Sequence, residues 1–228
     1  KDGFLKHILL VVPIIALLML QPHFSASMVI ITIVAVMMIL AGCKFWHFLA
    51  TGGAVGIPGM IGLIILEPYR LARVTTFLDP WKDATGTGWQ VIQSLYAIGS
   101  GGLFGAGLGE SKQKYLYIPE PHNDFIFSVL AEELGFVGCV LVIVLFAIFI
   151  WRGVLIAMKS PDMFGSLIAI GITTMVAIQV ILNIAVVTSS VPATGMPLPF
   201  FSYGGTALFI LLCEMGVLLN ISRASVKS

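Results

Sequence analysis

Charge is scarce in this chain, and its scarcity indicates the class of protein. Lys, Arg, Asp and Glu make up 10% of the 228 residues, whereas 58% are hydrophobic. Soluble domains carry about 25% charged residues, so the composition indicates a membrane protein in contact with lipid. The formal net charge of +1 lacks the basic surplus typical of nucleic-acid binding, and we expect no nucleic-acid partner.

Cysteine is also sparse. Its copies are Cys43, Cys139 and Cys213, each in or beside an apolar run and without the paired spacing of metal ligands. We therefore predict buried thiols, with no disulfide and no protein metal centre. The chain opens at Lys1 with neither an initiator Met nor a signal-peptide cleavage site, so we expect the C-terminal portion of a longer polytopic protein.

Long apolar runs dominate the rest of the sequence. A membrane-spanning helix needs about 20 mostly apolar residues. The candidate spans are Ile8–Leu20, Met28–Gly42, Phe45–Leu66, Phe125–Trp151, Phe164–Val187 and Thr206–Ile221. The predicted fold class is therefore all-α: a polytopic membrane helix bundle of about six transmembrane helices, forming a single membrane domain over residues 1–228.

Two short loops, 21–27 and 188–205, contain neither Lys nor Arg. If the N-terminus lies in the cytoplasm, the basic residues at both termini and in the remaining short connections are all cytoplasmic. They are Lys1, Lys6, Lys44, Arg152, Lys159, Arg223 and Lys227. The positive-inside rule therefore predicts cytoplasmic termini. It also makes 67–124 a long extracytoplasmic loop.

Glycines interrupt the apolar part of that loop, residues 89–108. They include Gly99, Gly101, Gly102, Gly105 and Gly107. We predict a re-entrant or interfacial element packed on the bundle, because irregular backbone at membrane depth must be covered by protein. The alternative, one more true span, would put the C-terminus outside and remove the charge asymmetry.

Acidic groups and an apolar run meet in "YIPEPHNDFIFSVLAEELG", residues 117–135. In one interpretation Asn123 or Asp124 is a helix N-cap. In the other, Asn123 caps the helix and Asp124 faces a cavity as a candidate general base, oriented by Glu120 and His122. Pro119 and Pro121 would hold the approach extended.

Glu132 and Glu133 lie two turns deeper in the same run. At 100° per residue they point about 80° and 180° away from Asp124, so they cannot both share its face. Acids inside a membrane are costly, and we predict that at least one faces the bundle interior in a structural role.

Polar groups also line the last two candidate spans. Gln179 and Asn183 are spaced i, i+4 on one helix face, and Glu214 lies in the final span. They form a polar lining, either between helices or along a cavity wall. Prolines at 192, 197 and 199 forbid a continuous helix between these spans and predict a shaped loop.

Basic residues in the long segment suit an anionic group such as a pyrophosphate. They are Arg70, Arg73, Lys82, Lys112 and Lys114. The alternative is ordinary solvated pairing with the acids of the same segment, which are Glu67, Asp79, Asp83 and Glu110.

Two stretches together carry a resemblance that covers essentially the whole chain. "RVTTFLDPWKDATGTGWQVIQSLYAIGSGGLFGAGLGESKQKYLYIPEPHNDFIFSVLAEELG" and "PATGMPLPFFSYGGT" closely resemble the SEDS family (shape, elongation, division and sporulation). The resemblance implies a fold of about ten spans, of which this chain would hold the last six. It also implies an inverting peptidoglycan glycosyltransferase that polymerises lipid II at the outer face of the bacterial cytoplasmic membrane, with a class B penicillin-binding transpeptidase as partner.

The resemblance also implies roles for single residues. The family's essential aspartate falls on Asp124. The implied substrate-binding positions are Arg73, Lys114, Glu120, His122, Ser202, Tyr203, Gly204 and Gly205, and a divalent cation, Mg²⁺ or Mn²⁺, is a candidate cofactor. Two alternatives stay open: a lipid II flippase, and a non-catalytic scaffold that recruits the transpeptidase.

The chain departs from the family pattern at four positions. His23 and Ser25 replace an aspartate and a glycine, Asn123 replaces a threonine, and Ser190 stands where glycine is common. These departures suggest a divergent, sporulation-type member. They leave Asp124 intact.

Overall fold

The computed structural model describes residues 2–20, 24–44, 46, 62, 68–86, 88–111 and 123–227. The predictions made for Lys114, Glu120 and His122 lie outside these residues, as do those for His23 and nearly all of Phe45–Leu66. Within the described ranges every regular element is a helix, which confirms the all-α fold class.

The elements run along the chain as α1 (Asp2–Leu20), α2 (Phe24–Leu40), α5 (Pro68–Leu78), the 3₁₀ turn η2 (Pro80–Asp83), α6 (Trp89–Ser100), α8 (Ile126–Met158), α9 (Met163–Val187) and α10 (Gly205–Lys227). Three of them, α8, α9 and α10, are long and apolar enough to cross a membrane, and α1 and α2 contain shorter apolar stretches. Together with the composition, these helices make the chain a multi-pass membrane protein.

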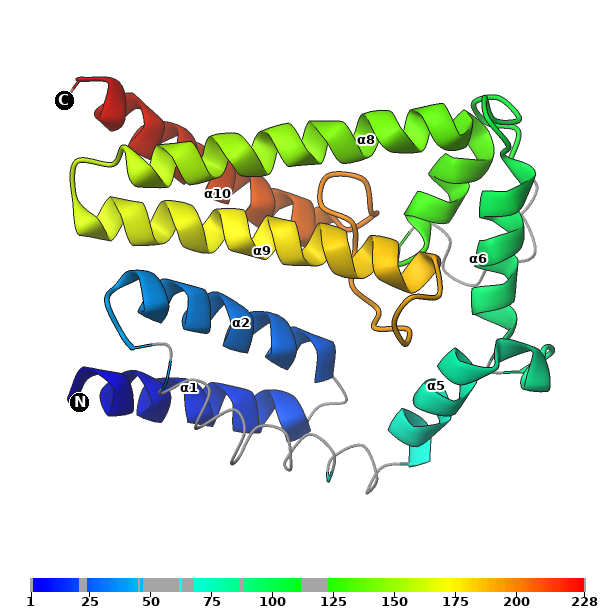
Figure 1. Ribbon diagram of the computed structural model, residues 1–228, viewed down its shortest axis with the longest axis horizontal. Helices are drawn as coiled ribbons and strands as arrows, with labels where there is room; N and C mark the ends of the chain where they lie inside the picture. Colours follow the sequence, from blue (N-terminus) through cyan, green and yellow to red (C-terminus); the bar gives the residue numbers. More distant parts are fainter. Residues whose placement is uncertain are drawn as a thin grey trace.

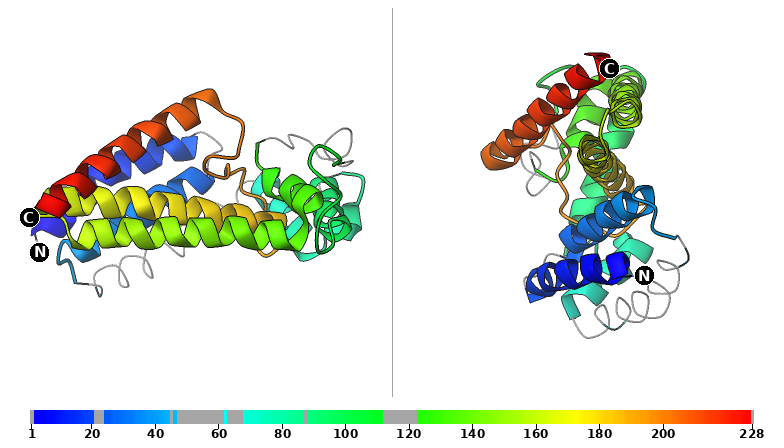
Figure 2. Two further views of the ribbon diagram at one scale, coloured as in Figure 1. Left: turned by 90° about the horizontal axis from the view of Figure 1, so that it is seen from above. Right: turned by 90° about the vertical axis from the view of Figure 1, so that its left-hand side faces the viewer.

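The long helices lie side by side, and the two short ones cover one end of them. Figure 1 shows α8 above α9, α1 and α2 below, and α5 and α6 beyond the end where α9 stops. Figure 2 shows the same arrangement from two further sides, with both termini at the opposite end of the bundle. The segment predicted as one long loop is therefore partly helical, and its described part lies at one end of the bundle.

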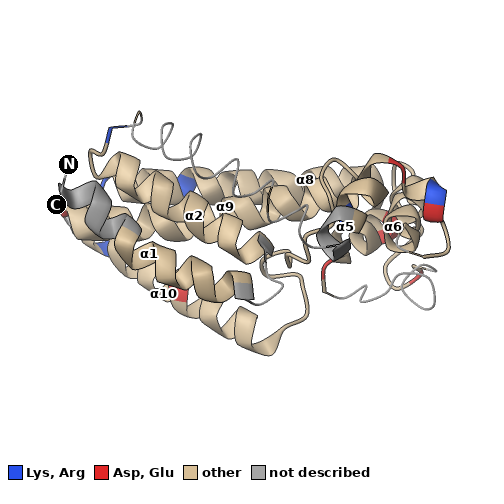
Figure 3. Cartoon of the chain, turned by 90° about the horizontal axis from the view of Figure 1, so that it is seen from below, with Lys and Arg blue, Asp and Glu red and all other residues tan. Residues whose placement is uncertain are grey.

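Basic residues gather at the end that holds the termini. Figure 3 shows blue patches there, where the chain places Lys44 after α2, Lys159 after α8 and Arg223 near the end of α10. The basic residues of the short connections thus share one end of the bundle, whereas Arg73 of α5 and Lys82 of η2 belong to the elements at the other end. Which end is cytoplasmic remains a prediction from the positive-inside rule.

Small residues allow the long helices to approach closely. A Cβ at Gly153 of α8 would collide with Thr173 of α9, and one at Gly171 of α9 would lie 3.0 Å from the Met37 sulfur of α2. Without a hydrophobic force between helices in lipid, such close backbone packing is what holds them together. Helix α9 begins where the Asp162 carboxylate accepts a hydrogen bond from the Gly165 N–H at 2.8 Å, an N-cap that the sequence "SPDMFG" encodes.

Helix α8 is broken near its start. Gly135 has φ +68° and ψ −169°, values outside the helical region, and Figure 1 shows the short first segment bent sharply away from the rest. The predicted span Phe125–Trp151 is therefore wrong in its first part. Only glycine adopts this conformation readily, so the break falls at Gly135. The long part of α8 starts after Gly135 and runs to Met158.

The glycine-rich turn after α6 fills this break. Its carbonyls accept two hydrogen bonds from α8: Phe136 N donates to Gly102 O at 2.9 Å, and Val137 N donates to Leu103 O at 3.1 Å. In return Ala106 N donates to Glu132 O at 2.9 Å, and Gly107 N donates to Glu133 O at 3.1 Å. A Cβ at Gly101 or Gly105 would collide with the α8 backbone, so glycine at these two positions allows the turn to pack closely against α8. The backbone groups freed by the break are thus satisfied by protein.

The N-cap prediction is also corrected. The N-cap position of α8 is Phe125, so neither Asn123 nor Asp124 occupies it. Phe125 is 2% exposed and belongs to the main apolar core. The helix therefore begins one residue later than a cap at Asp124 would place it.

Candidate functional site

Asp124 lies in the turn that leads into α8, and two side chains from other elements hold its backbone. Asn183 of α9 donates from Nδ2 to Asp124 O at 2.8 Å and to Met196 O at 2.8 Å. Ser202 donates from Oγ to Asn123 O at 2.6 Å and accepts from Leu198 N at 2.7 Å. Consecutive carbonyls of the Asp124 turn are thus tied to α9 and to the 188–204 loop.

The 188–204 loop forms a wall beside the Asp124 carboxylate. Gly195 has φ +69°, and a Cβ at this position would lie 3.3 Å from Asp124 Oδ2. Arg73 of α5 donates from Nη1 to Ala193 O at 2.8 Å, which ties the helix at the end of the bundle to the same stretch of loop. Arg73 and Asp124 therefore contact the loop two residues apart.

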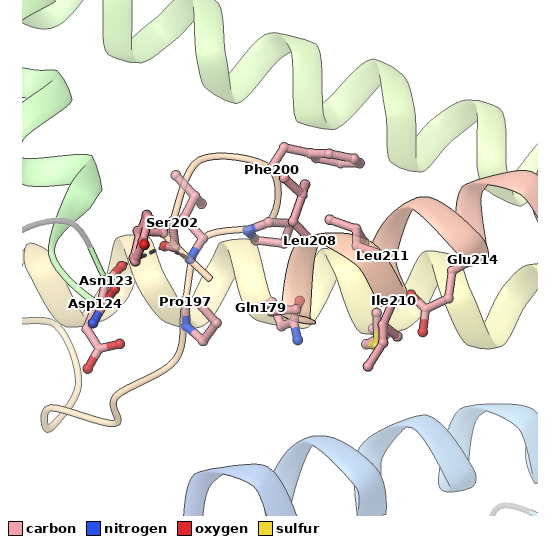
Figure 4. Close-up of a pocket in the computed structure, with 15 residues that line it drawn as sticks. Asn123, Asp124, Gln179, Pro197, Phe200, Ser202, Leu208, Ile210, Leu211 and Glu214 are labelled. Atoms are coloured by element: carbon pink, nitrogen blue, oxygen red, sulfur yellow. Dashed lines mark hydrogen bonds between the residues drawn. The ribbon is translucent and has the colours of Figure 1, made fainter. Parts of the chain in front are cut away.

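A cavity of about 370 Å³ opens beside this turn. Figure 4 shows Asp124, Asn123 and Ser202 at one end, Gln179 in the middle, and Leu208, Ile210, Leu211 and Glu214 of α10 toward the other. Its volume falls within the range of small-molecule sites. The cavity combines one polar end, where the carboxylate of Asp124 is half-buried, with a mostly apolar remainder.

Glu214 is the polar exception on the α10 side of the cavity. Its Oε2 is buried without a hydrogen-bond partner among the described residues. It lies nine residues into a spanning helix, about 14 Å at 1.5 Å per residue. An acid at this depth is costly, and it marks this part of the cavity as a candidate site of function.

Phe200 is held in an unusual backbone conformation at the cavity wall. Its φ is +67°, a left-handed value that is rare for a bulky residue. The ring is 41% exposed, lines the cavity and meets Phe149 of α8 edge-on at a centroid distance of 6.2 Å. Strain of this kind persists where the surrounding structure enforces it and is often found at functional sites.

The predicted substrate-binding residues of the loop take different places. The Ser202 hydroxyl already bonds to two backbone groups, so its visible role is to join the loop to the Asp124 turn. Tyr203 lines the cavity and is 83% exposed. Gly204 ends the loop and Gly205 begins α10, with no atom within 4 Å of a Cβ at Gly205.

The predicted polar lining divides into two groups. Gln179 faces the cavity, and Asn183 is 1% exposed behind it. Glu132 is 4% exposed and accepts a hydrogen bond from Ser111 Oγ at 2.5 Å, away from the cavity, and Glu133 is half-buried. The two glutamates therefore belong to the contact between α8 and the glycine-rich turn.

Sequence reasoning missed several residues that shape the site. Gly195 and Phe200 were seen only as parts of a proline-rich loop, although glycine beside three prolines is a signal for a turn that needs positive φ. Ser94 and Ser128 gave no signal. The Ser94 hydroxyl donates to Val187 O at 2.8 Å and lies 2.6 Å from Ser128 Oγ, which joins α6, α8 and α9.

Comparison with known sequences identifies relatives over almost the whole chain. The sequence pattern of a family described as cell cycle protein, which covers FtsW, RodA and SpoVE, matches residues 1–227. Stage V sporulation protein E of Bacillus subtilis (strain 168) is 48% identical over 225 residues, 99% of this chain and 61% of that protein. A probable peptidoglycan glycosyltransferase FtsW of Geobacter sp. (strain M18) is 44% identical over 221 residues, 97% of this chain and 60% of that protein.

Solved structures show the same fold. A chain from a peptidoglycan synthase complex that coordinates polymerization and crosslinking matches with a TM-score of 0.77 at 32% identity, covering 99% of this chain and 63% of that one. Rod shape determining protein RodA of Thermus thermophilus matches with a TM-score of 0.64 at 29% identity, covering 98% of this chain and 57% of that one. The present chain spans about 60% of the length of these relatives. The chain belongs to the family of FtsW, RodA and SpoVE, the SEDS family whose motifs its sequence resembles.

Proposed function

We propose that the protein to which this chain belongs is a peptidoglycan glycosyltransferase that polymerises lipid II, with Asp124 as its general base. The observation that carries the proposal is the position of the Asp124 carboxylate, half-buried at the polar end of a cavity and fixed through its own backbone. The relatives named probable peptidoglycan glycosyltransferase FtsW supply the reaction class.

The proposed chemistry is an inverting transfer. Asp124 takes the proton from the 4-hydroxyl of the acceptor sugar while that oxygen attacks the anomeric carbon of the donor. The bond from that carbon to the donor's pyrophosphate breaks, and undecaprenyl pyrophosphate leaves. Arg73, beside the loop that walls Asp124, and Lys114, which lies outside the described residues, would neutralise the leaving phosphates.

A divalent cation has no complete protein site in the described part of the chain. No three His, Cys, Asp or Glu side chains come together there. The cavity itself offers only the carboxylates of Asp124 and Glu214, on different elements at opposite ends of the view in Figure 4. The residues that the structure describes do not make a metal centre, and we route no step through a cation.

The setting of the reaction follows from the charge separation. We place the end with α5, α6 and Asp124 at the outer face of the bacterial cytoplasmic membrane and the C-terminus in the cytoplasm, because Lys44, Lys159 and Arg223 gather at the opposite end. The proposed partner is a class B penicillin-binding transpeptidase. The fold shared with a complex of polymerization and crosslinking supports it. The identity to a stage V sporulation protein favours a sporulation role.

The decisive experiment compares two Asp→Asn changes in the full-length protein, reconstituted with lipid II in the presence and absence of the transpeptidase. Asp124→Asn should lower polymer formation on a gel by about 10²–10⁴-fold, the range for one general base. Asp162→Asn is the matched control, because Asn caps a helix as well as Asp does, and it should keep wild-type activity. Wild-type polymerisation by Asp124→Asn would refute the assignment and favour a scaffold role.

One observation favours a second candidate, a lipid II flippase. The Oε2 atom of Glu214, which has no hydrogen-bond partner among the described residues, lies deep in a spanning helix, and transporter sites lie near the bilayer midplane. A scrambling assay with labelled lipid II in vesicles tests it. Transbilayer movement that is lost in Glu214→Met and kept in Asp124→Asn would support transport.

A further inference from the structure

The side chain of Asn183 in α9 joins two other segments of the chain. Both of its amide hydrogens go to backbone carbonyls of other elements, one at Asp124 and one at Met196. The two acceptors lie 59 and 13 residues from Asn183 in sequence, so the bonds hold separate segments together rather than stabilising α9 itself.

The side chain is placed at a cost. Asn183 is 1% exposed, and its Oδ1 is buried with no hydrogen-bond partner in the described part of the chain. A buried polar atom left unpaired costs about 1–3 kcal/mol. Since both N–H groups are engaged by carbonyls, exchanging the amide oxygen and nitrogen would leave two carbonyls facing an oxygen. The amide orientation is therefore fixed by its two acceptors.

The two acceptors lie at the Asp124 end of the cavity, because Asp124 and Pro197, the residue after Met196, both line it. One is the carbonyl of Asp124 itself. The other, Met196 O, directly follows Gly195, the residue that lies against the Asp124 carboxylate. Asn183 therefore sets the distance between the residue that carries the carboxylate and the loop that faces it. Ser202 makes a parallel tie one residue earlier, to Asn123 O.

We propose that Asn183 is a positioning residue, which holds the Asp124 carboxylate in register with the loop at residues 195–196 so that it meets the acceptor hydroxyl. The inference rests on the proposed function of Asp124. Asn183 does not touch the substrate, because its side chain lies behind the cavity wall. Its loss should therefore lower the rate of the chemical step more than the affinity for lipid II.

The test uses the full-length protein in proteoliposomes and measures kcat and KM for lipid II, together with the thermal midpoint. Asn183→Leu removes both donors, and Asn183→Gln keeps the amide but moves it by one methylene. The control is Thr173→Val on the same helix, since Thr173 is also 1% exposed and, among the described residues, its hydroxyl donates to Ala169 O within α9. Any general effect of removing a buried polar group from α9 should therefore appear in this control as well.

We expect kcat to fall at least about tenfold in Asn183→Leu, and less in Asn183→Gln, because a displacement near 1 Å costs up to about 10² in rate. KM should change less than about threefold, and Thr173→Val should match wild type. Equal kcat in Asn183→Leu and Thr173→Val would overturn the inference. If Asn183→Leu does not fold, a wild-type kcat in Asn183→Gln would by itself be enough to overturn the inference. An active Asp124→Asn would instead refute the proposed base, so the two failures are distinguishable.

Discussion

Gly195 leaves the space that the Asp124 carboxylate occupies. Residue 195 has φ +69°, and a Cβ there would lie 3.3 Å from Asp124 Oδ2, closer than an ordinary contact. A side chain at this position would therefore act on the acid in two ways, by strain in its own backbone and by pressure on the carboxylate. No other described glycine has a contact with Asp124 at its Cβ position.

Gly195→Ala should lower both activity and stability. A left-handed conformation costs an L-residue roughly 1–2 kcal/mol, and the added methyl pushes Asp124 Oδ2 away. Polymerisation rate and thermal midpoint are the measurements. Gly216→Ala in α10 is the control, because a Cβ there meets nothing within 4 Å, and it should preserve both values. A wild-type rate in Gly195→Ala would show that the carboxylate does not depend on this wall.

Phe200 and Ser189 allow strain to be separated from function, since both have positive φ, +67° and +52°. Replacement by glycine relieves roughly 1–2 kcal/mol at each. Ser189→Gly should raise the thermal midpoint and leave activity unchanged. Phe200→Gly also loses the ring that contacts Phe149 and lines the cavity, so lipid II binding should weaken. Binding is measured by titration with labelled lipid II. Unchanged affinity in Phe200→Gly would make the ring a packing element only.

Gly135→Ala should destabilise the protein by more than the backbone term alone. The residue has φ +68°, and its Cβ would collide with the backbone of Leu103 and Gly105 in the turn that fills the break of α8. The expected loss exceeds roughly 1–2 kcal/mol, seen as a lower thermal midpoint. Gly99→Ala in the nearby α6 meets no atom and should stabilise by about 0.5–1 kcal/mol. Equal behaviour of the two variants would contradict the close approach.

Glu214→Met should keep or raise the thermal midpoint, because it removes a buried carboxylate oxygen that has no partner among the described residues. Leaving such an atom unpaired costs about 1–3 kcal/mol. The measurement is thermal denaturation of the full-length protein in detergent. Met215→Leu on the neighbouring position is the control for side-chain exchange in α10. A clear fall in the midpoint of Glu214→Met would mean that the carboxylate binds a group elsewhere in the protein.

Composition and apolar run length were sufficient to predict an all-helical membrane protein, because a helix that crosses the hydrocarbon core of a bilayer must be apolar over nearly its whole length. The ends of α9 were also predictable, since a proline, an N-capping aspartate and a later proline-rich loop mark them. The charge asymmetry predicted which loops share an end of the bundle. Lys44, Lys159 and Arg223 lie together as that argument requires.

The break in α8 was not predictable from periodicity. The run from Phe125 onward is mostly apolar, and Gly135 within it resembles an ordinary helix-packing glycine. Only the contact with the turn at residues 101–107, distant in sequence, determines that Gly135 leaves the helical region. The same limit applies to the site. The motif around Asp124 suggested a base, but its backbone partners Asn183 and Ser202 follow from tertiary packing that no local pattern encodes.

The ties on the Asp124 turn have a consequence for the order of assembly. Its carbonyls are bonded by side chains that come 59 and 79 residues later in the chain, and Arg73 reaches a carbonyl 120 residues later. During synthesis the N-terminal portion emerges first. The turn therefore lacks these ties until α9 and the loop before α10 have been synthesised. A polypeptide released before α9 would carry every residue of the acidic motif and still lack the side chains that hold the Asp124 turn.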